Sequence, residues 1–310
     1  MRGLRTAWSM TRQTFSEWSN DKGGRLGAAL SYYTVFSLAP LLLVVISVAG
    51  LVFGRQAAEG SLFEQLAGLV GSDAARLIQS AVAKAHQTKG GVLGTGIGIL
   101  VLLAGATGVV IELQDALDTV WKVRPRPNRG IWGVVRTRLL SVAMILTLGF
   151  LLLVSLVVNA ALAALSGWLR AAFGNIAVVS WVIDAVVALT VISTLIALIY
   201  KILPDAKVAW RDVWVGALAT AILFMIGKYL IGLYIGKASV GSAFGAAGSL
   251  AVLLVWIYYS AQIVLLGAEF TRVYANRFGA KVRPSPQAVP AQESAAARPP
   301  PAPDARPQEA

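Results

Sequence analysis

Few side chains in this chain of 310 residues are suited to chemistry, and the most concentrated group is acidic. Glu112, Asp115 and Asp118 fall on roughly one side of a helix within the stretch IELQDALDTVW. A cluster of carboxylates can bind a metal ion or supply a general acid and a general base. The same three residues also fit a solvated helix end that faces the basic stretch KVRPRPNR, and we favour this second interpretation.

Other signs of catalysis are weak. His86 is the single histidine and there is no cysteine, so a metal site built from these two residue types is not expected. The glycines of GVLGTGIGIL, Gly91 to Leu100, lack the preceding strand and the following Lys-Ser/Thr pair of a phosphate-binding loop. The four-residue spacing of Gly94 and Gly98 instead favours close helix packing. We therefore expect no catalytic residues, no metal and no cofactor.

Two charged residues lie inside long apolar runs, Asp184 and Lys228. Charged groups at membrane depth are costly, and they usually face the protein interior and pair with one another. If the two runs form adjacent antiparallel helices, both charges lie at similar depth, and Asn159 of a third run could join them. Lys228 could alternatively extend to the membrane surface. Pairing predicts a site that is either structural or part of a proton or substrate path.

A second set of polar residues accompanies two other apolar runs. LSYYTVFSLAP places Tyr33, Ser37 and Pro40 near one side of a helix, and Pro40 should kink it. LLVWIYYSAQ adds Trp256, Tyr259 and Gln262. We expect these six residues to form one polar seam between the first and last helices. The seam could line a permeation cavity or consist of static hydrogen bonds between helices, and both interpretations remain open.

The composition indicates whether these residues belong to a soluble protein or to a membrane protein. Hydrophobic residues make up 57% of the chain, charged residues make up 14%, and the mean hydropathy is +0.70. Soluble domains are nearer half apolar and one quarter charged. The chain is therefore predicted to be an integral membrane protein, and its net charge of +12 needs a local explanation.

Six apolar runs are long enough to cross a bilayer, for which a helix needs about 20 residues. The predicted fold is therefore an all-α, polytopic bundle of six transmembrane helices, within a membrane domain of residues 23–280. The predicted spans are residues 28–53, 92–111, 139–165, 176–200, 213–235 and 246–268.

The basic residues orient these spans. Twenty of the 27 Lys and Arg residues fall in the N-terminal segment, the second loop, the fourth loop and the C-terminal segment. All four segments lie on the same side of a six-span chain. By the positive-inside rule both termini are expected to be cytoplasmic. The rule explains the net charge without a nucleic-acid partner.

Three regions lie outside the spans. Residues 1–22 carry large apolar residues at helical spacing among basic and polar ones, which predicts an amphipathic helix on the inner membrane surface. The outer loop, 54–91, should contain two short amphipathic helices. Residues 284–310 are rich in Pro and Ala and are expected to be disordered.

Four motifs, in order over about residues 20–280, resemble the YihY/virulence factor BrkB family of bacterial inner-membrane proteins. They are AALSYYTVFSLAPLLL, LQDALDTVWKV, YKILPDAKVAWRDVWVGAL and LLVWIYYSAQIVLLGAEF. Asp118 departs from the asparagine expected in the family's second motif. The resemblance implies a six-helix membrane bundle and links to virulence and envelope lipid handling. An older label of the family is ribonuclease BN, but this sequence contains no set of catalytic residues that would support that activity.

These observations lead to three competing functions. The first is a transporter or flippase for a lipid or another amphipathic envelope substrate, with membrane lipids as partners and basic loops suited to anionic headgroups. The second is a non-transporting scaffold for envelope proteins, and the third and least favoured is an RNA-processing enzyme. The sequence does not identify the substrate, the energy source, the oligomeric state or a protein partner.

Overall fold

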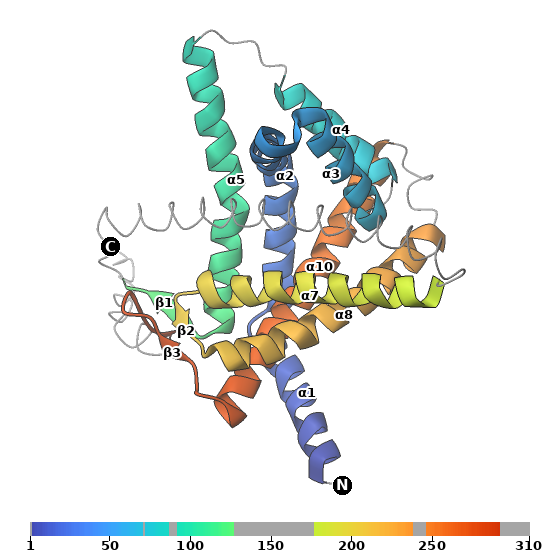
Figure 1. The fold of residues 1–310 in the computed structure, drawn as a ribbon. Helices are drawn as coiled ribbons and strands as arrows, with labels where there is room; N and C mark the ends of the chain where they lie inside the picture. The colour runs from blue at the N-terminus through green and yellow to red at the C-terminus, as the bar shows by residue number, and fades with distance from the viewer. Residues whose placement is uncertain (1, 71, 87–91, 127–176, 238–245, 292–310) are drawn as a thin grey trace, which may run out of the picture.

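The computed structural model describes residues 2–70, 72–86, 92–126, 177–237 and 246–291, and these residues are mostly helical. The helices, labelled as in Figure 1, are α1 (Arg2–Asn20), α2 (Gly23–Phe53), α3 (Arg55–Val70), α4 (Ser72–His86), α5 (Val92–Val120), α7 (Ala177–Ile202), α8 (Trp210–Lys237) and α10 (Ala246–Phe278). Four short strands join them: β1 (Val123–Pro125), β2 (Ala206–Lys207), β3 (Arg283–Pro284) and β4 (Ala288–Pro290).

Four helices in the described part of the chain are long and apolar enough to cross a membrane. The qualifying segments are Gly23–Ser47, Ala185–Ile202, Trp210–Leu233 and Gly248–Phe278. They correspond to the first, fourth, fifth and sixth predicted spans. A helix, α5, covers the second predicted span, and the third, 139–165, lies outside the described residues. The helical class and the membrane-spanning character are confirmed, and the count of six spans stays a prediction.

The last long helix, α10, lies between two helix pairs. Figure 1 shows α2 and α5 running side by side, and α7 alongside α8. α10 contacts α8 on one side and α2 on another, and α1 packs against its C-terminal part. The short helices α3 and α4 cover the far end of α2, where Leu42 and Ile46 meet Ala75 and Ile78 of α4. The helix α10 therefore has packing partners on more than one side.

The largest hydrophobic core lies where the C-terminal ends of α5, α7 and α10 meet the N-terminal end of α8. We call this end of the molecule the base. Trp121 and Tyr200 are buried there and pack edge to face, with ring centroids 6.4 Å apart. The Tyr200 hydroxyl donates a hydrogen bond of 2.6 Å to the Val264 carbonyl oxygen of α10. The base joins all four segments that the positive-inside rule assigns to one side.

Two strand pairs complete the base, and they correct the sequence interpretation. β1 pairs with β4 and β2 pairs with β3, both antiparallel. The prediction of a disordered tail from residue 284 was therefore wrong for residues 284–291, and the fold is not purely helical. Backbone hydrogen bonds hold this segment in place, because Ser285 N–H donates to Asp205 O and Ala291 N–H donates to Lys122 O. Residues 292–310 lie outside the described part.

Two glycines allow α8 and α10 to approach each other closely. The Thr271 side chain of α10 lies over Gly216 of α8, and the Thr220 side chain of α8 lies over Gly267 of α10. A Cβ atom on either glycine would overlap the threonine that faces it. Small residues at such crossings let helix backbones come together in membranes. This reciprocal packing fixes the crossing of the two helices that bound the candidate site.

Candidate functional site

The three acidic residues at the end of α5 have different surroundings. Asp118 is only 4% exposed, and its Oδ1 accepts a hydrogen bond of 2.7 Å from the Asp205 backbone N–H. Asp115 is exposed. Burial raises the pKa of the half-buried Glu112 carboxyl, and the Asp115 carboxylate raises it further. The solvated interpretation is therefore wrong for Asp118, which holds the α7–α8 connection to α5.

No metal site emerges from the part of the chain that the structure describes. Within it, no group of three or more His, Asp and Glu side chains is arranged to hold a metal ion. His86 ends α4, and nothing is described of its side chain.

The six residues of the predicted seam do not form one surface. Tyr33, Ser37 and Pro40 of α2 lie against the glycines Gly105 and Gly108 of α5, and α2 continues as a helix through Pro40. Ser37 is buried, whereas Tyr33 is 43% exposed. The α2 half of the seam therefore faces α5 rather than α10.

The seam residues of α10 also contact different neighbours. Tyr259 lies against Gly227 of α8, and Trp256 packs edge to face with Phe224 of α8 at 6.4 Å. Gln262 turns toward the N-terminal helices. Its Oε1 accepts a hydrogen bond of 3.0 Å from Trp18 Nε1, and its Nε2 donates to Gly23 O at 3.2 Å. The prediction of one seam fails because α10 is packed on several sides, so its polar residues serve different neighbours.

A pocket touches the predicted seam. It has a volume of about 250 Å³ and lies among α2, α3, α4, α5, α7 and α10. Of the six seam residues, Trp256 lines it, together with the hydroxyl-bearing Thr34 and Ser260. The Thr34 hydroxyl donates to Leu30 O within its own helix, so it offers little to a polar solute.

The predicted charge pair stays a prediction. Asn159 lies outside the described residues, and so does the side chain of Asp184. Lys228 is exposed on α8. The helices α7 and α8 do pack against each other, as the pairing requires.

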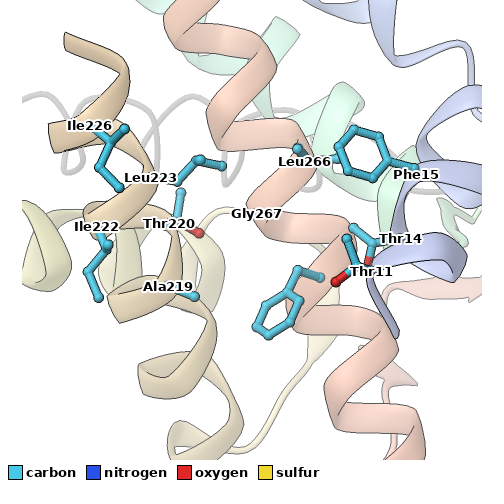
Figure 2. Close-up of a pocket in the computed structure, with 11 residues that line it drawn as sticks. Thr11, Thr14, Phe15, Ala219, Thr220, Ile222, Leu223, Ile226, Leu266 and Gly267 are labelled. Atoms are coloured by element: carbon cyan, nitrogen blue, oxygen red, sulfur yellow. The ribbon is translucent and has the colours of Figure 1, made fainter. Parts of the chain in front are cut away.

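A groove of about 340 Å³ lies among α1, α8 and α10, and Figure 2 shows the side chains around it. We call it the groove. Each helix contributes part of the lining, which is almost entirely apolar. The lining residues are Thr11, Thr14, Phe15, Ala219, Thr220, Ile222, Leu223, Ile226, Leu266, Gly267 and Phe270.

The outer edge of the groove is open. Ile226 is 54% exposed and Phe15 is 53% exposed, so an apolar molecule can reach the lining from the side of α8. Both α8 and α10 qualify as membrane-crossing helices. In a bilayer this opening would meet acyl chains rather than water.

Two threonine hydroxyls lie at the inner wall, and they differ in their hydrogen bonding. The Thr220 hydroxyl donates 2.7 Å to Gly216 O within α8. Thr14 is only 4% exposed, yet its Oγ1 has no hydrogen-bond partner among the described residues. Buried hydroxyls are usually hydrogen-bonded, so the Thr14 hydroxyl is an exception among the described residues.

Part of the surface of α1 is exposed. Trp8 is 73% exposed, and Arg5 and Arg12 are exposed with it. An amphipathic helix with exposed aromatic and basic residues is typical of a membrane surface. Thr11, Thr14 and Phe15 of the same helix line the groove.

Five charged residues hold α1 against α10. We call Glu17, Asp21, Lys122, Glu269 and Arg272 the α1 anchor. Arg272 Nη2 lies 2.8 Å from Glu17 Oε2 and 2.9 Å from Glu269 Oε2. Lys122 Nζ forms an ion pair with Asp21 Oδ1 and a second one, 3.7 Å long, with Glu17 Oε2. The anchor therefore ties α1, the end of α5 and α10 together beside the groove.

Sequence reasoning missed both the groove and the α1 anchor. Glu269 is fully buried, although it directly follows the predicted sixth span. The spacing of Glu269 and Arg272, three residues apart on one helix, was the one available signal. No local signal links either residue to Glu17 or Asp21, which lie some 250 positions earlier.

Comparisons with known proteins agree with this architecture. Residues 14–292 match the family model described as virulence factor BrkB. The chain is 31% identical over 281 residues to a UPF0761 membrane protein of Verminephrobacter eiseniae, covering 86% of this chain and 62% of that one. It is 29% identical to a UPF0761 membrane protein of Albidiferax ferrireducens, covering 84% of this chain and 61% of that one.

The chain thus spans about six-tenths of the length of the curated relatives that it matches. Their printed names describe membrane proteins and state no activity. No solved structure matches the chain.

Proposed function

The chain belongs to the virulence factor BrkB family, and we propose that it binds the acyl chain of a membrane lipid, or of another amphipathic envelope substrate, in the groove and moves that substrate across the bilayer. The observation that supports this most is the groove itself, an apolar channel open along a membrane-crossing helix and closed on one side by an amphipathic helix.

The dimensions and chemistry of the groove suit part of a lipid. Small-molecule sites commonly have volumes of about 300 to 1,000 Å³, and the groove, at about 340 Å³, is at the lower end. It would hold a segment of one acyl chain rather than a whole lipid.

The proposed setting is the bacterial inner membrane, with six spans and both termini in the cytoplasm. Support comes from the base, which gathers the N-terminal segment, the residues after α5, the α7–α8 connection and the C-terminal segment at one end. These are the segments rich in Lys and Arg. Their positive charges would attract anionic lipid headgroups toward the base.

Reconstitution into liposomes tests the proposal. Movement of a fluorescently labelled phospholipid between leaflets should exceed that in protein-free vesicles. The Ala219→Phe substitution places a ring in the groove and should reduce the rate at least several-fold. Leu230→Phe is the matched control, because Leu230 lies on the same helix, is 54% exposed and does not line the groove.

Two results would contradict the proposal. No lipid movement above the protein-free level, for several lipid classes, would reject transport and leave a scaffold role as the better account. Equal rates for the Ala219→Phe and Leu230→Phe variants would show that lipid movement does not use the groove.

A further inference from the structure

Two carboxyl groups of the α1 anchor face each other with no cation between them. The Glu269 carboxyl lies near enough to the Asp21 carboxyl for a hydrogen bond to form between them if one of the two is protonated. Glu269 is fully buried, and the Asp21 side chain is 10% exposed. As plain carboxylates, Glu269 Oε1 and Asp21 Oδ2 would both be buried acceptors, and neither has a donor within the described part of the chain. Carboxylate oxygens can hydrogen-bond to each other only if a proton lies between them.

The other oxygen of each carboxyl already has a cation. Glu269 Oε2 accepts from Arg272 Nη2 at 2.9 Å and from Arg272 Nε at 3.2 Å. Asp21 Oδ1 is paired with Lys122 Nζ. Each carboxyl therefore has one oxygen paired with a cation, and its other oxygen is buried without a donor among the described residues.

The charges of the α1 anchor do not balance without an additional positive charge. Its members are the carboxyls of Glu17, Asp21 and Glu269 and the cations of Lys122 and Arg272. Glu17 lies between the two cations and offers nothing positive. Three carboxylates and two cations would leave one negative charge beside the buried Glu269 carboxyl, which is costly. One proton makes the cluster neutral.

We propose that Glu269 and Asp21 form a proton-binding site, in which one proton is shared between Glu269 Oε1 and Asp21 Oδ2. The proton comes from water on the side of the base and returns to it, so the step changes no covalent bond other than one carboxyl O–H. Two facing carboxyls that share one proton are a recognised way to hold a group protonated near neutral pH.

The site lies where protonation can act on the groove. When the proton leaves, two negative charges face each other across the α1–α10 contact, and α1 is held less firmly. The residues that α1 adds to the groove, Thr11, Thr14 and Phe15, precede Glu17 on the same helix, and Asp21 follows the end of that helix. A proton-linked movement of α1 would open this wall. This consequence rests on the proposed function, whereas the proton site itself does not.

Infrared spectroscopy of the purified full chain tests the site directly. A protonated carboxylic acid has its own C=O stretching band, separate from that of a carboxylate. The wild-type protein should show this band at neutral pH and lose it as the pH is raised. Glu269→Gln and Asp21→Asn should each remove it, because the new amide donates to the remaining carboxylate and the proton is no longer needed. Both substitutions keep the size and shape of the side chain.

The control variant is Glu64→Gln, which alters an exposed carboxyl on α3 and should leave the band unchanged. A wild-type protein without the band at neutral pH would overturn the proposal, as would a band that persists in both Glu269→Gln and Asp21→Asn. A thermal stabilisation by Na⁺ at constant ionic strength, lost in Glu269→Gln, would also overturn it in favour of a metal cation. Failure of lipid transport in liposomes would contradict the proposed function and leave the infrared result unaffected.

Discussion

Gly216 and Gly267 are the residues on which the α8–α10 crossing depends most directly. Each lies under a threonine of the opposite helix, and both threonines are buried. The threonine hydroxyls donate to carbonyl oxygens of their own helices, at 2.7 Å in both cases, so neither side chain can rotate away freely. Extra atoms at such positions force the helices apart.

We predict that Gly216→Ala and Gly267→Ala each lower the free energy of unfolding by about 1 to 3 kcal/mol, as overpacking of a closed contact does. Gly232→Ala is the matched control on α8, because no atom lies within 4 Å of the position of its Cβ. Thermal unfolding in detergent measures all three. Equal melting temperatures for the Gly216→Ala and Gly232→Ala variants would contradict the close packing.

The predicted pairing of Asp184 with Lys228 is also tested by substituting single residues. Asp184→Asn and Lys228→Met should each reduce stability, because each leaves the other charge alone at membrane depth. The double variant should recover part of the loss. Thermal unfolding of the four proteins forms a double-mutant cycle, and strictly additive losses would reject the pairing.

Residue patterns along the sequence identified local features better than distant ones. Asp118 was visible as part of an acidic group, but its burial depends on the Asp205 backbone, 87 positions later. The seam residues were grouped by helical spacing, which cannot say which neighbour each side of α10 meets. Glu17 and Glu269 come together only through tertiary packing, so no pattern within either segment could predict that they lie close to each other.

At the scale of elements, the C-terminal strands are the feature that composition concealed. Pro and Ala in residues 284–291 suggested disorder, but strand pairing needs backbone groups rather than large apolar side chains. β4 pairs with β1 directly after α5, and the carbonyl of Lys122 accepts a hydrogen bond of 3.0 Å from Ala291 N–H. These strands therefore support the residue that pairs with Asp21.

Truncation measures this contribution. A chain ending at Val282 loses β3 and β4 and the buried Ala288, so its melting temperature should fall, with each lost backbone hydrogen bond contributing about 1 kcal/mol. A chain ending at Ala291 keeps both strands and should melt like the full chain. If the two truncated chains melt at the same temperature, the strands do not stabilise the base.

At the scale of the whole molecule, the segments rich in Lys and Arg lie at the base. Charge counting along the sequence assigned four segments to one side of the membrane, and the structure packs those segments into one core. The agreement arises because topology is dictated by short-range rules, apolar length and flanking charge. The tilt and crossing of the helices follow from packing, and the sequence alone could not supply them.

The orientation is testable because the chain has no cysteine, so each introduced thiol is unique. In intact cells a membrane-impermeant thiol reagent should label Gln79→Cys on α4, an exposed position at the end opposite the base. It should label Lys207→Cys on β2, an exposed position at the base, only after the membrane is permeabilised. The reverse order of labelling would place both termini outside the cytoplasm.

The central claim is that an acyl chain occupies the groove, and photo-crosslinking to a phospholipid with a photoactivatable acyl chain tests it most directly. Mass spectrometry should find the lipid preferentially on Ala219–Ile226 of α8 and Leu266–Phe270 of α10, and Ala219→Phe should abolish this preference while Leu230→Phe preserves it. Labelling spread evenly over the exposed apolar residues of α8, including Tyr229 and Leu233, and unchanged by Ala219→Phe would contradict the claim.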